Sequence, residues 1–185
     1  MDLKRLALVG LTLWACAPAR TPGFVSGRLP GTDGASHPIV DPEAKFTVVE
    51  FFSAHCPCQA QHDARLRELV KRYRGQGIAF VAIDSEAEAT VSRDRAEAAR
   101  RGYPYVILVD PEGTAARAMK ADYATYSLLV DRAGTVLFRG GIDSDRSHLR
   151  DDATPYLQNA IDDVLAARPV RLPEAKTLGC SLMLK

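Results

Sequence analysis

Charge of one sign and long apolar runs are both scarce in this sequence. The formal net charge is only +1, so the chain lacks the excess of basic residues by which proteins bind nucleic acid. No stretch reaches the roughly 18 apolar residues of a membrane-spanning helix. The remaining composition, 46% apolar and 25% charged residues, is ordinary for a globular protein. A chain of 185 residues is long enough for one domain with a hydrophobic core.

The first 16 residues predict a secretory signal. Two basic residues precede a short apolar run, residues 6–15, which ends at Cys16; this order is typical of an export signal. The ending LWAC resembles a bacterial lipobox, in which the cysteine becomes the lipidated first residue of the mature protein. A plain signal peptide that is cut near APA is the alternative. Because Ala17 and not aspartate follows Cys16, the resemblance implies an outer-membrane lipid anchor that faces the periplasm, with residues 17–24 as a tether.

Cysteine is scarce as well, with four in the whole chain. Whether Cys16 is lipidated or removed, Cys56, Cys58 and Cys180 would be the remaining cysteines with free sulfurs. An odd number of cysteines in an exported protein indicates a free or exchanging thiol and not a closed disulfide framework. Cys56 and Cys58, with a proline between them and His55 and His62 nearby, therefore form the first candidate site.

The rest of the chain alternates strand-like and helix-like segments. The expected strands are residues 45–53, 78–84, 105–110 and a hairpin across 126–143; the expected helices follow Cys56, span 86–102 and 111–120, and include 156–165. A loose hairpin is expected within 25–41 and an irregular tail at the C-terminus. This order predicts an α/β sandwich with a mixed sheet. The charged segment 86–101 is expected to be a solvent-exposed face.

Cys56 lies where the first of these helices should begin, directly after the strand that is expected to be central in the sheet. As its N-cap, Cys56 would be followed by Pro57 at N1, where the missing N–H costs nothing. Gln59 at N3 could then reach back to the cap. The unpaired N–H groups and the positive end of the helix dipole would face the Cys56 sulfur and stabilise its thiolate, which is the nucleophilic form. A protonated His55 would add to this effect. The sequence therefore predicts a reactive sulfur that solvent can reach.

Glu50 interrupts the apolar strand six residues before Cys56. A carboxyl group inside a sheet is costly unless it is partnered or neutral, so burial would raise its pKa. Glu50 is then either a general acid and base for thiol exchange or a solvated residue at a strand edge.

Four motifs carry a resemblance to a known family. VVEFFSAHCPCQAQ resembles the thioredoxin-superfamily pattern of a strand that runs into a cysteine helix, and DRAGTVLFRGGID resembles its hairpin. GRLPGTDG resembles the preceding hairpin of redoxins. LGCSLMLK resembles the tail of the alkyl hydroperoxide reductase/thiol-specific antioxidant, peroxiredoxin-like, family. The resemblance implies a thioredoxin-like three-layer sandwich with a central mixed sheet and an N-terminal hairpin extension. The redoxin domain would span 25–168, and a tail with Cys180 would span 169–185.

The sulfur that would resolve an adduct on Cys56 is left open by this resemblance. Thioredoxins carry the second cysteine at N3, which Gln59 occupies here, and Cys58 lies at N2. Side chains two positions apart on a helix point about 200° from one another, so a Cys56–Cys58 disulfide would be strained and easily reduced. Cys180, from the same or a neighbouring chain, and an external thiol are the alternatives.

The substrate is left open as well. Ser53 can stand for the threonine of the peroxiredoxin site pattern, but Val49 replaces its proline, and the arginine that polarises peroxide has no counterpart that can be placed. Thioredoxins carry a cis-proline about where Thr125 stands, and Glu50 matches their buried carboxylate, which relays a proton to the second cysteine. The substrate is therefore either a peroxide or a protein disulfide.

The leading hypothesis is an exported thiol-based oxidoreductase that needs no cofactor. Cys56 would attack the substrate, Cys58 or Cys180 would clear the adduct, and an external thiol would restore the protein. A lipid anchor would be its only contact with the membrane, and no nucleic acid is expected as a partner. The alternative is a periplasmic protein that binds copper or zinc through His55, Cys56, Cys58 and His62. A third possibility is a redox-inactive binding module that kept the fold.

Overall fold

The computed structural model describes residues 25–185. The predicted signal with Cys16 and the tether, residues 1–24, lie outside the described residues, so export and lipidation stay predictions. Within residues 25–185, no helix is long and apolar enough to cross a membrane.

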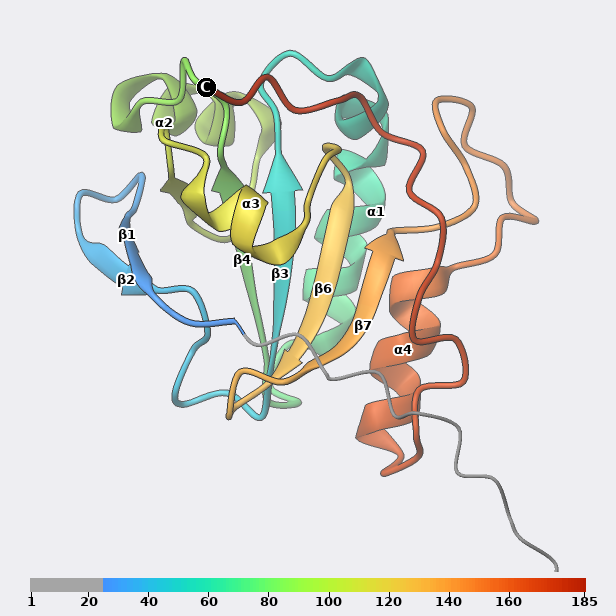
Figure 1. Cartoon of the computed structure of the whole chain (residues 1–185). Helices are drawn as coiled ribbons and strands as arrows, with labels where there is room; N and C mark the ends of the chain where they lie inside the picture. The colour runs from blue at the N-terminus through green and yellow to red at the C-terminus, as the bar shows by residue number, and fades with distance from the viewer. Residues whose placement is uncertain (1–24) are drawn as a thin grey trace, which may run out of the picture.

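The described chain contains a hairpin, a central sheet and four helices (Figure 1). In chain order the elements are β1 (Arg28–Pro30), β2 (Ser36–Pro38), β3 (Phe46–Phe52), α1 (Pro57–Tyr73), β4 (Ile78–Asp84), α2 (Val91–Arg101), β5 (Ile107–Val109), α3 (Thr114–Met119), β6 (Tyr126–Asp131), β7 (Val136–Gly141) and α4 (Tyr156–Leu165).

The five-stranded sheet has the order β5-β4-β3-β6-β7. β3 pairs parallel with β4 and antiparallel with β6, and β6 pairs antiparallel with β7. β1 and β2 form a separate antiparallel hairpin. The predicted mixed sheet, the central position of β3 and the N-terminal hairpin are thereby confirmed, as is the thioredoxin-like fold class. Since parallel β3 ends at the centre of the sheet, the loop that follows it opens onto the middle of one sheet edge.

Side-chain alternation along β3 divides the core into two layers. Val48 packs with residues of α1 and α4, while Phe52 packs on the same face beside α2. Val49 and Phe51 point to the opposite face, which α3 and the hairpin cover. Figure 1 looks onto the α3 face, with α1 behind the sheet. Glu50, in phase with Val48, therefore points beneath α1.

The C-terminal tail, residues 169–185, has irregular backbone as predicted, but it is bound to the fold along its length. It first follows β7, where the Arg139 N–H donates to the Pro173 carbonyl. It then crosses above the carboxyl end of β3 (Figure 1), where the Ala124 N–H donates to the Cys180 carbonyl at 2.9 Å. Its last residues reach the loop after β4, where the Ala87 N–H donates to the Met183 carbonyl at 2.8 Å.

The expectation that residues 86–101 form a solvent-exposed face is wrong in part. Glu86, Asp94 and Arg101 from this segment are buried. Arg101 makes two hydrogen bonds of 2.7 Å to the Asp63 carboxylate of α1 and lies over the ring of Phe52. Isolated charges avoid burial, but Glu86 and Arg101 find partners on other segments, and Asp94 pairs with Arg93 of its own helix.

Candidate active site

Cys56 is the N-cap of α1, as predicted. Its backbone is extended, with φ −82° and ψ 109°, and Pro57 follows at the first helical position. The Gln59 N–H donates to the Cys56 sulfur at 3.4 Å. One of the unpaired donors of the first turn therefore points at the sulfur, which is the arrangement that stabilises a thiolate.

The Gln59 side chain does not close the predicted capping box. Its Oε1 accepts from the Ser53 N–H at 2.7 Å, and its Nε2 donates to the Glu50 carboxylate at 3.0 Å. The Cys56 N–H donates to the Ser53 carbonyl at 3.4 Å instead. The Gln59 amide binds the Glu50 carboxyl group instead of the helix cap, because a buried carboxyl group requires a hydrogen-bond donor.

The sulfurs of Cys56, Cys58 and Cys180 all lie within 4.8 Å of one another, and all three cysteines are free thiols. The Cys58 N–H donates to the Cys180 sulfur, and the Cys180 thiol hydrogen-bonds to Cys56. Two sulfurs from segments far apart in sequence thus share the N-terminus of one helix. Burial, the hydrogen bond to Cys56 and the Cys56 charge together raise the pKa of Cys180 to about 12.

The expectation that solvent reaches Cys56 is wrong. Only 2% of Cys56 and 6% of Cys58 is exposed. The cover is the tail, since Leu182 belongs to the same apolar cluster as both cysteines and Cys180 packs against it. The local pattern around Cys56 carries no information about a segment more than 100 residues away. Burial of Cys56 by the tail therefore could not be predicted from this motif.

Glu50 takes the buried alternative. It is 1% exposed, and burial raises its pKa to about 7 although the Gln59 amide donates to it. The Tyr105 hydroxyl donates to its other oxygen at 3.2 Å. Gln59 stands between this carboxyl group and Cys56, because its backbone N–H reaches the sulfur and its side chain reaches the carboxylate. Glu50 and Cys56 are therefore linked by hydrogen bonds through Gln59.

Ser53 joins the cysteine loop to the tail through Glu86. The Ser53 hydroxyl donates to Glu86 Oε1 at 3.0 Å and accepts the His55 N–H at 3.2 Å. The same Glu86 oxygen accepts the Met183 N–H of the tail at 3.4 Å. Sequence reasoning missed Glu86 because it lies in the charged segment that was assigned to solvent. The only signal for it was its position two residues after the end of a buried parallel strand.

The two histidines do not join the sulfurs. His55 is exposed, with its Nε2 3.9 Å from Glu88. His62 is buried; its Nδ1 donates to the Cys58 carbonyl at 2.7 Å, and its Nε2 donates to Asp143 at 3.2 Å. Although burial opposes the charge, these two acceptors raise the pKa of His62. Because both ring nitrogens are hydrogen-bonded to protein oxygens, His62 directs no nitrogen at the sulfurs in this arrangement.

Thr125 supports the tail from below. Its φ is +66°, in the left-handed region, and its N–H donates to the Phe51 carbonyl at 3.0 Å. No peptide bond among residues 25–185 is cis, in keeping with the absence of a proline at this position. The bend leaves the preceding N–H, that of Ala124, free to bind the Cys180 carbonyl.

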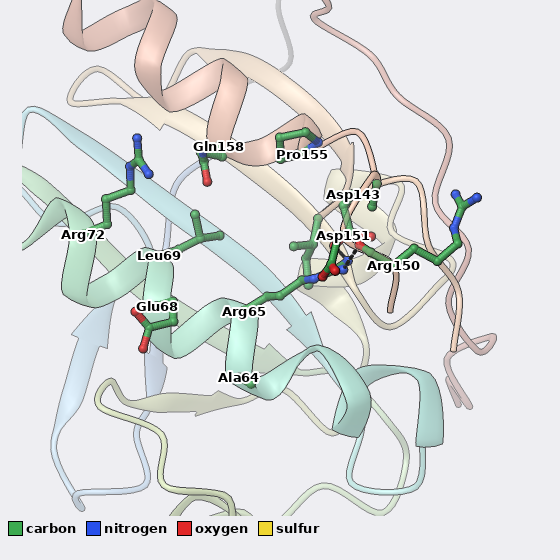
Figure 2. A pocket seen from close by; sticks show the side chains of 12 residues that line it. Ala64, Arg65, Glu68, Leu69, Arg72, Asp143, Arg150, Asp151, Pro155 and Gln158 are labelled. Carbon is green, nitrogen blue, oxygen red and sulfur yellow. Dashed lines mark hydrogen bonds and ion pairs between the residues drawn. The ribbon is translucent and has the colours of Figure 1, made fainter. Parts of the chain in front are cut away.

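A groove of about 540 Å³ lies between α1 and the start of α4 (Figure 2). Arg65 and Asp143 lie at its inner wall, 2.6 Å apart, and Arg150 enters from the far side. The groove touches the cysteine site only indirectly, through the bond between Asp143 and His62. Arg65 and Arg150, which both line the groove, are each paired with Asp145.

Comparison with known proteins agrees with this geometry. A model of the Redoxin family matches residues 17–153. The chain belongs to the Redoxin family. The predicted resemblance is thereby confirmed, and family membership supports a thiol redox function at a general level. Comparison with curated proteins finds no match.

Three solved structures show how widely the fold is shared. A hypothetical protein from Sinorhizobium meliloti is 27% identical, with a TM-score of 0.80 over 90% of this chain and 96% of that chain. An uncharacterized conserved protein from Geobacillus kaustophilus is 26% identical, with a TM-score of 0.81 over 90% and 93%. A putative thiol:disulfide interchange protein from Chlorobium tepidum is 19% identical, with a TM-score of 0.63 over 79% and 98%; this third likeness concerns the fold alone.

Proposed function

We propose that this Redoxin-family protein is a thiol oxidoreductase in which Cys56 attacks the substrate and Cys180 resolves the adduct. The observation that carries the proposal is the shared helix terminus: the Gln59 N–H points at the Cys56 sulfur and the Cys58 N–H points at the Cys180 sulfur. The two sulfurs thereby lie together at one helix terminus, where backbone donors of the same first turn reach both of them.

The exchange proceeds in two balanced steps. The Cys56 thiolate attacks a disulfide, forming a mixed disulfide and releasing one thiolate; with a hydroperoxide it forms a sulfenic acid and releases an alcohol or water. The Cys180 sulfur then attacks the Cys56 sulfur, forming a Cys56–Cys180 disulfide and releasing the second thiolate or water. Two electrons pass from the cysteine pair to the substrate, and an external thiol returns them.

Oxidation of Cys56 also prepares Cys180 for the second step. In the reduced protein, Cys56 raises the pKa of Cys180 through both its hydrogen bond and its charge, in addition to the larger effect of burial. Both contributions come from the reduced Cys56 sulfur and vanish once that sulfur is bonded to the substrate. The Cys58 N–H, which favours the Cys180 thiolate, remains. Cys180 therefore becomes the stronger nucleophile after Cys56 has reacted.

The cover over Cys56 favours a small substrate. With 2% of Cys56 exposed, a hydroperoxide or a low-molecular-weight disulfide can enter with a small shift of the tail, whereas a folded protein disulfide requires the tail to leave. If the predicted signal directs export, this chemistry would take place outside the cytoplasm, and lipidation of Cys16 would anchor it there.

Single-cysteine variants test the assignment. Cys56→Ser, Cys58→Ser and Cys180→Ser proteins are mixed with hydrogen peroxide or with a small aromatic disulfide, with an external thiol present, and substrate consumption is followed. We expect Cys56→Ser to fall to the uncatalysed rate, and Cys58→Ser to retain turnover. Cys180→Ser should accumulate the Cys56 adduct, detected as a mass increase. Full turnover by Cys180→Ser together with loss of turnover in Cys58→Ser would assign resolution to Cys58.

A further inference from the structure

The three sulfurs that meet at the start of α1 also have the arrangement of a metal site. We infer that Cys56, Cys58 and Cys180 in their reduced state form a trigonal thiolate site for one soft monovalent metal ion, Cu(I). The inference stands apart from the proposed oxidoreductase function, because it concerns what the reduced sulfurs bind and not what they transfer electrons to.

The first argument is distance. Each pair of sulfurs is within 4.8 Å. Three sulfurs around an ion at about 2.3 Å would lie about 4 Å from one another, so closing the site needs shifts of less than about 1 Å. The three cysteines reach this point from the N-cap of α1, its first turn and the tail. A tail cysteine held by the Ala124 N–H at 2.9 Å is already positioned before any ion arrives.

The second argument is the kind of donor. No histidine or carboxylate among residues 25–185 joins the three sulfurs within 4.8 Å. The nitrogens of His62 already donate to Cys58 and Asp143, and the Glu50 oxygens are occupied by Gln59 and Tyr105. Zinc in structural sites is almost always four-coordinate, and the fourth ligand is missing here. An all-sulfur set of three suits Cu(I), which takes soft thiolates.

The third argument is the surroundings. Cys56 and Cys58 are nearly fully buried and belong to the apolar cluster that contains Phe51 and Leu182. This cluster excludes water, which would otherwise supply a further oxygen ligand or promote oxidation of the ion. The negative charge of the three thiolates is offset by the helix N-terminus and by the N–H groups of Cys58 and Gln59.

Binding is a ligand exchange and needs no redox partner. One Cu(I) ion binds the three sulfurs and displaces the protons that they still carry, so the oxidation states of copper and sulfur stay unchanged. The bound ion would block attack by Cys56, and a Cys56–Cys180 disulfide would remove two of the three ligands. Metal binding and thiol exchange thus exclude each other at the same sulfurs.

The test is a competition titration of the reduced full-length chain with Cu(I) in the absence of oxygen, against a chromogenic Cu(I) chelator. We expect one ion per chain. Loss of a residue that only supports a metal ligand typically costs 10–100-fold in affinity, so loss of a ligand in Cys180→Ser should cost at least about 100-fold. His55→Ala, a matched change of an exposed residue beside the site, should leave the affinity unchanged. Circular dichroism of each variant checks the fold.

X-ray absorption of the copper-loaded wild-type protein keeps the inference testable even where a variant does not fold. Three sulfur neighbours and no nitrogen are the expected result. The inference would be overturned if the X-ray absorption shows only two sulfur neighbours or a histidine nitrogen. It would also be overturned if the titration shows that His55→Ala loses affinity or that the chelator removes all the copper. None of these results bears on thiol turnover, which is measured on the metal-free protein, so failure of the metal site and failure of the proposed oxidoreductase are distinguishable.

Discussion

At the scale of single residues, the site depends on a carboxyl group placed where the strand would otherwise carry an apolar side chain. Glu50 lies beneath α1 and binds Gln59, whose backbone N–H reaches the Cys56 sulfur. Burial raises the pKa of Glu50 from its ordinary value of 4.5 to about 7. Near neutral pH this residue can therefore hold or release a proton, a property that an exposed glutamate lacks.

Glu50 also gives the fold a pH dependence with a definite sign. Between pH 4.5 and 7 the folded protein keeps a proton on Glu50 that the unfolded chain has lost, so stability falls as pH rises through this window and levels off above it. We expect the decrease in the free energy of unfolding over this pH range to be smaller in Glu50→Gln, by up to about 3 kcal/mol. Urea unfolding of both proteins at pH 5 and pH 8 measures it.

In Glu50→Gln the free energy of unfolding should still fall with pH, but less steeply than in the wild-type protein. The remaining fall is expected because burial and the neighbouring Asp94 also raise the pKa of Asp84 to about 7. Burial raises the pKa of Asp94 in the same direction, and His62, with a raised pKa, likewise loses its contribution as pH rises. An unchanged difference between pH 5 and pH 8 in Glu50→Gln would show that the carboxyl group is ionised in the folded state.

Local rules explain which residues of the site were predictable. The cap at Cys56 and Pro57 at N1 follow from helix-start chemistry within four residues, and the structure has both. The actual partners of Gln59 and the burial of Cys56 depend on Glu50 below and on the tail above. Such contacts leave no periodic pattern in the sequence, so the capping box and the exposed sulfur were predicted wrongly.

At the scale of elements, the tail is the part that turns a cysteine helix into a covered three-sulfur site. It has almost no regular structure, yet its backbone pairs with three elements in turn. At Gly179 it passes so close to the 124–125 bend that an added Cβ would lie 1.7 Å from the Ala124 carbonyl oxygen. Only glycine permits this approach, so Gly179 fixes where Cys180 sits.

Gly179→Ala should therefore lift the tail from the site. Overpacking costs about 1–3 kcal/mol, which corresponds to roughly 5- to 150-fold more of the open form. We expect alkylation of Cys56 and Cys180 by a small maleimide to accelerate by that factor. Mass spectrometry of the labelled peptides against time measures it.

Gly75→Ala is the matched control, since φ is +76° there and an added Cβ meets nothing within 4 Å. That change strains the backbone but leaves the tail untouched, so thiol labelling should keep its wild-type rate. Equal rates in wild-type and Gly179→Ala proteins would mean that the tail does not limit access to the sulfurs.

At the scale of the whole molecule, the sequence predicted the architecture better than the site. Alternating apolar runs and helical periodicity were enough for the mixed sheet, the central strand and the N-terminal hairpin. The charged segment before and within α2 was misjudged, because its burial depends on partners such as Asp63 for Arg101 and Ser53 for Glu86. Partnership between distant segments is a property of the folded chain and has no local signature.

Hydrogen bonds between distant segments also hold the cysteine loop and the C-terminal tail together. Ser53 and Met183 both bind Glu86, so the cysteine loop and the tail are held by one side chain. Cys56 and Cys180 are thereby brought together in the reduced protein, as the proposed exchange requires.

The most direct test of the account is to identify the first disulfide that forms. The reduced protein is treated with one equivalent of hydrogen peroxide, free thiols are blocked at once with an alkylating reagent, and the disulfide-linked peptides are mapped by mass spectrometry. The account predicts a Cys56–Cys180 link within one chain, with Cys58 alkylated. A Cys56–Cys58 link as the main product, or three alkylated cysteines with no oxidation, would contradict it.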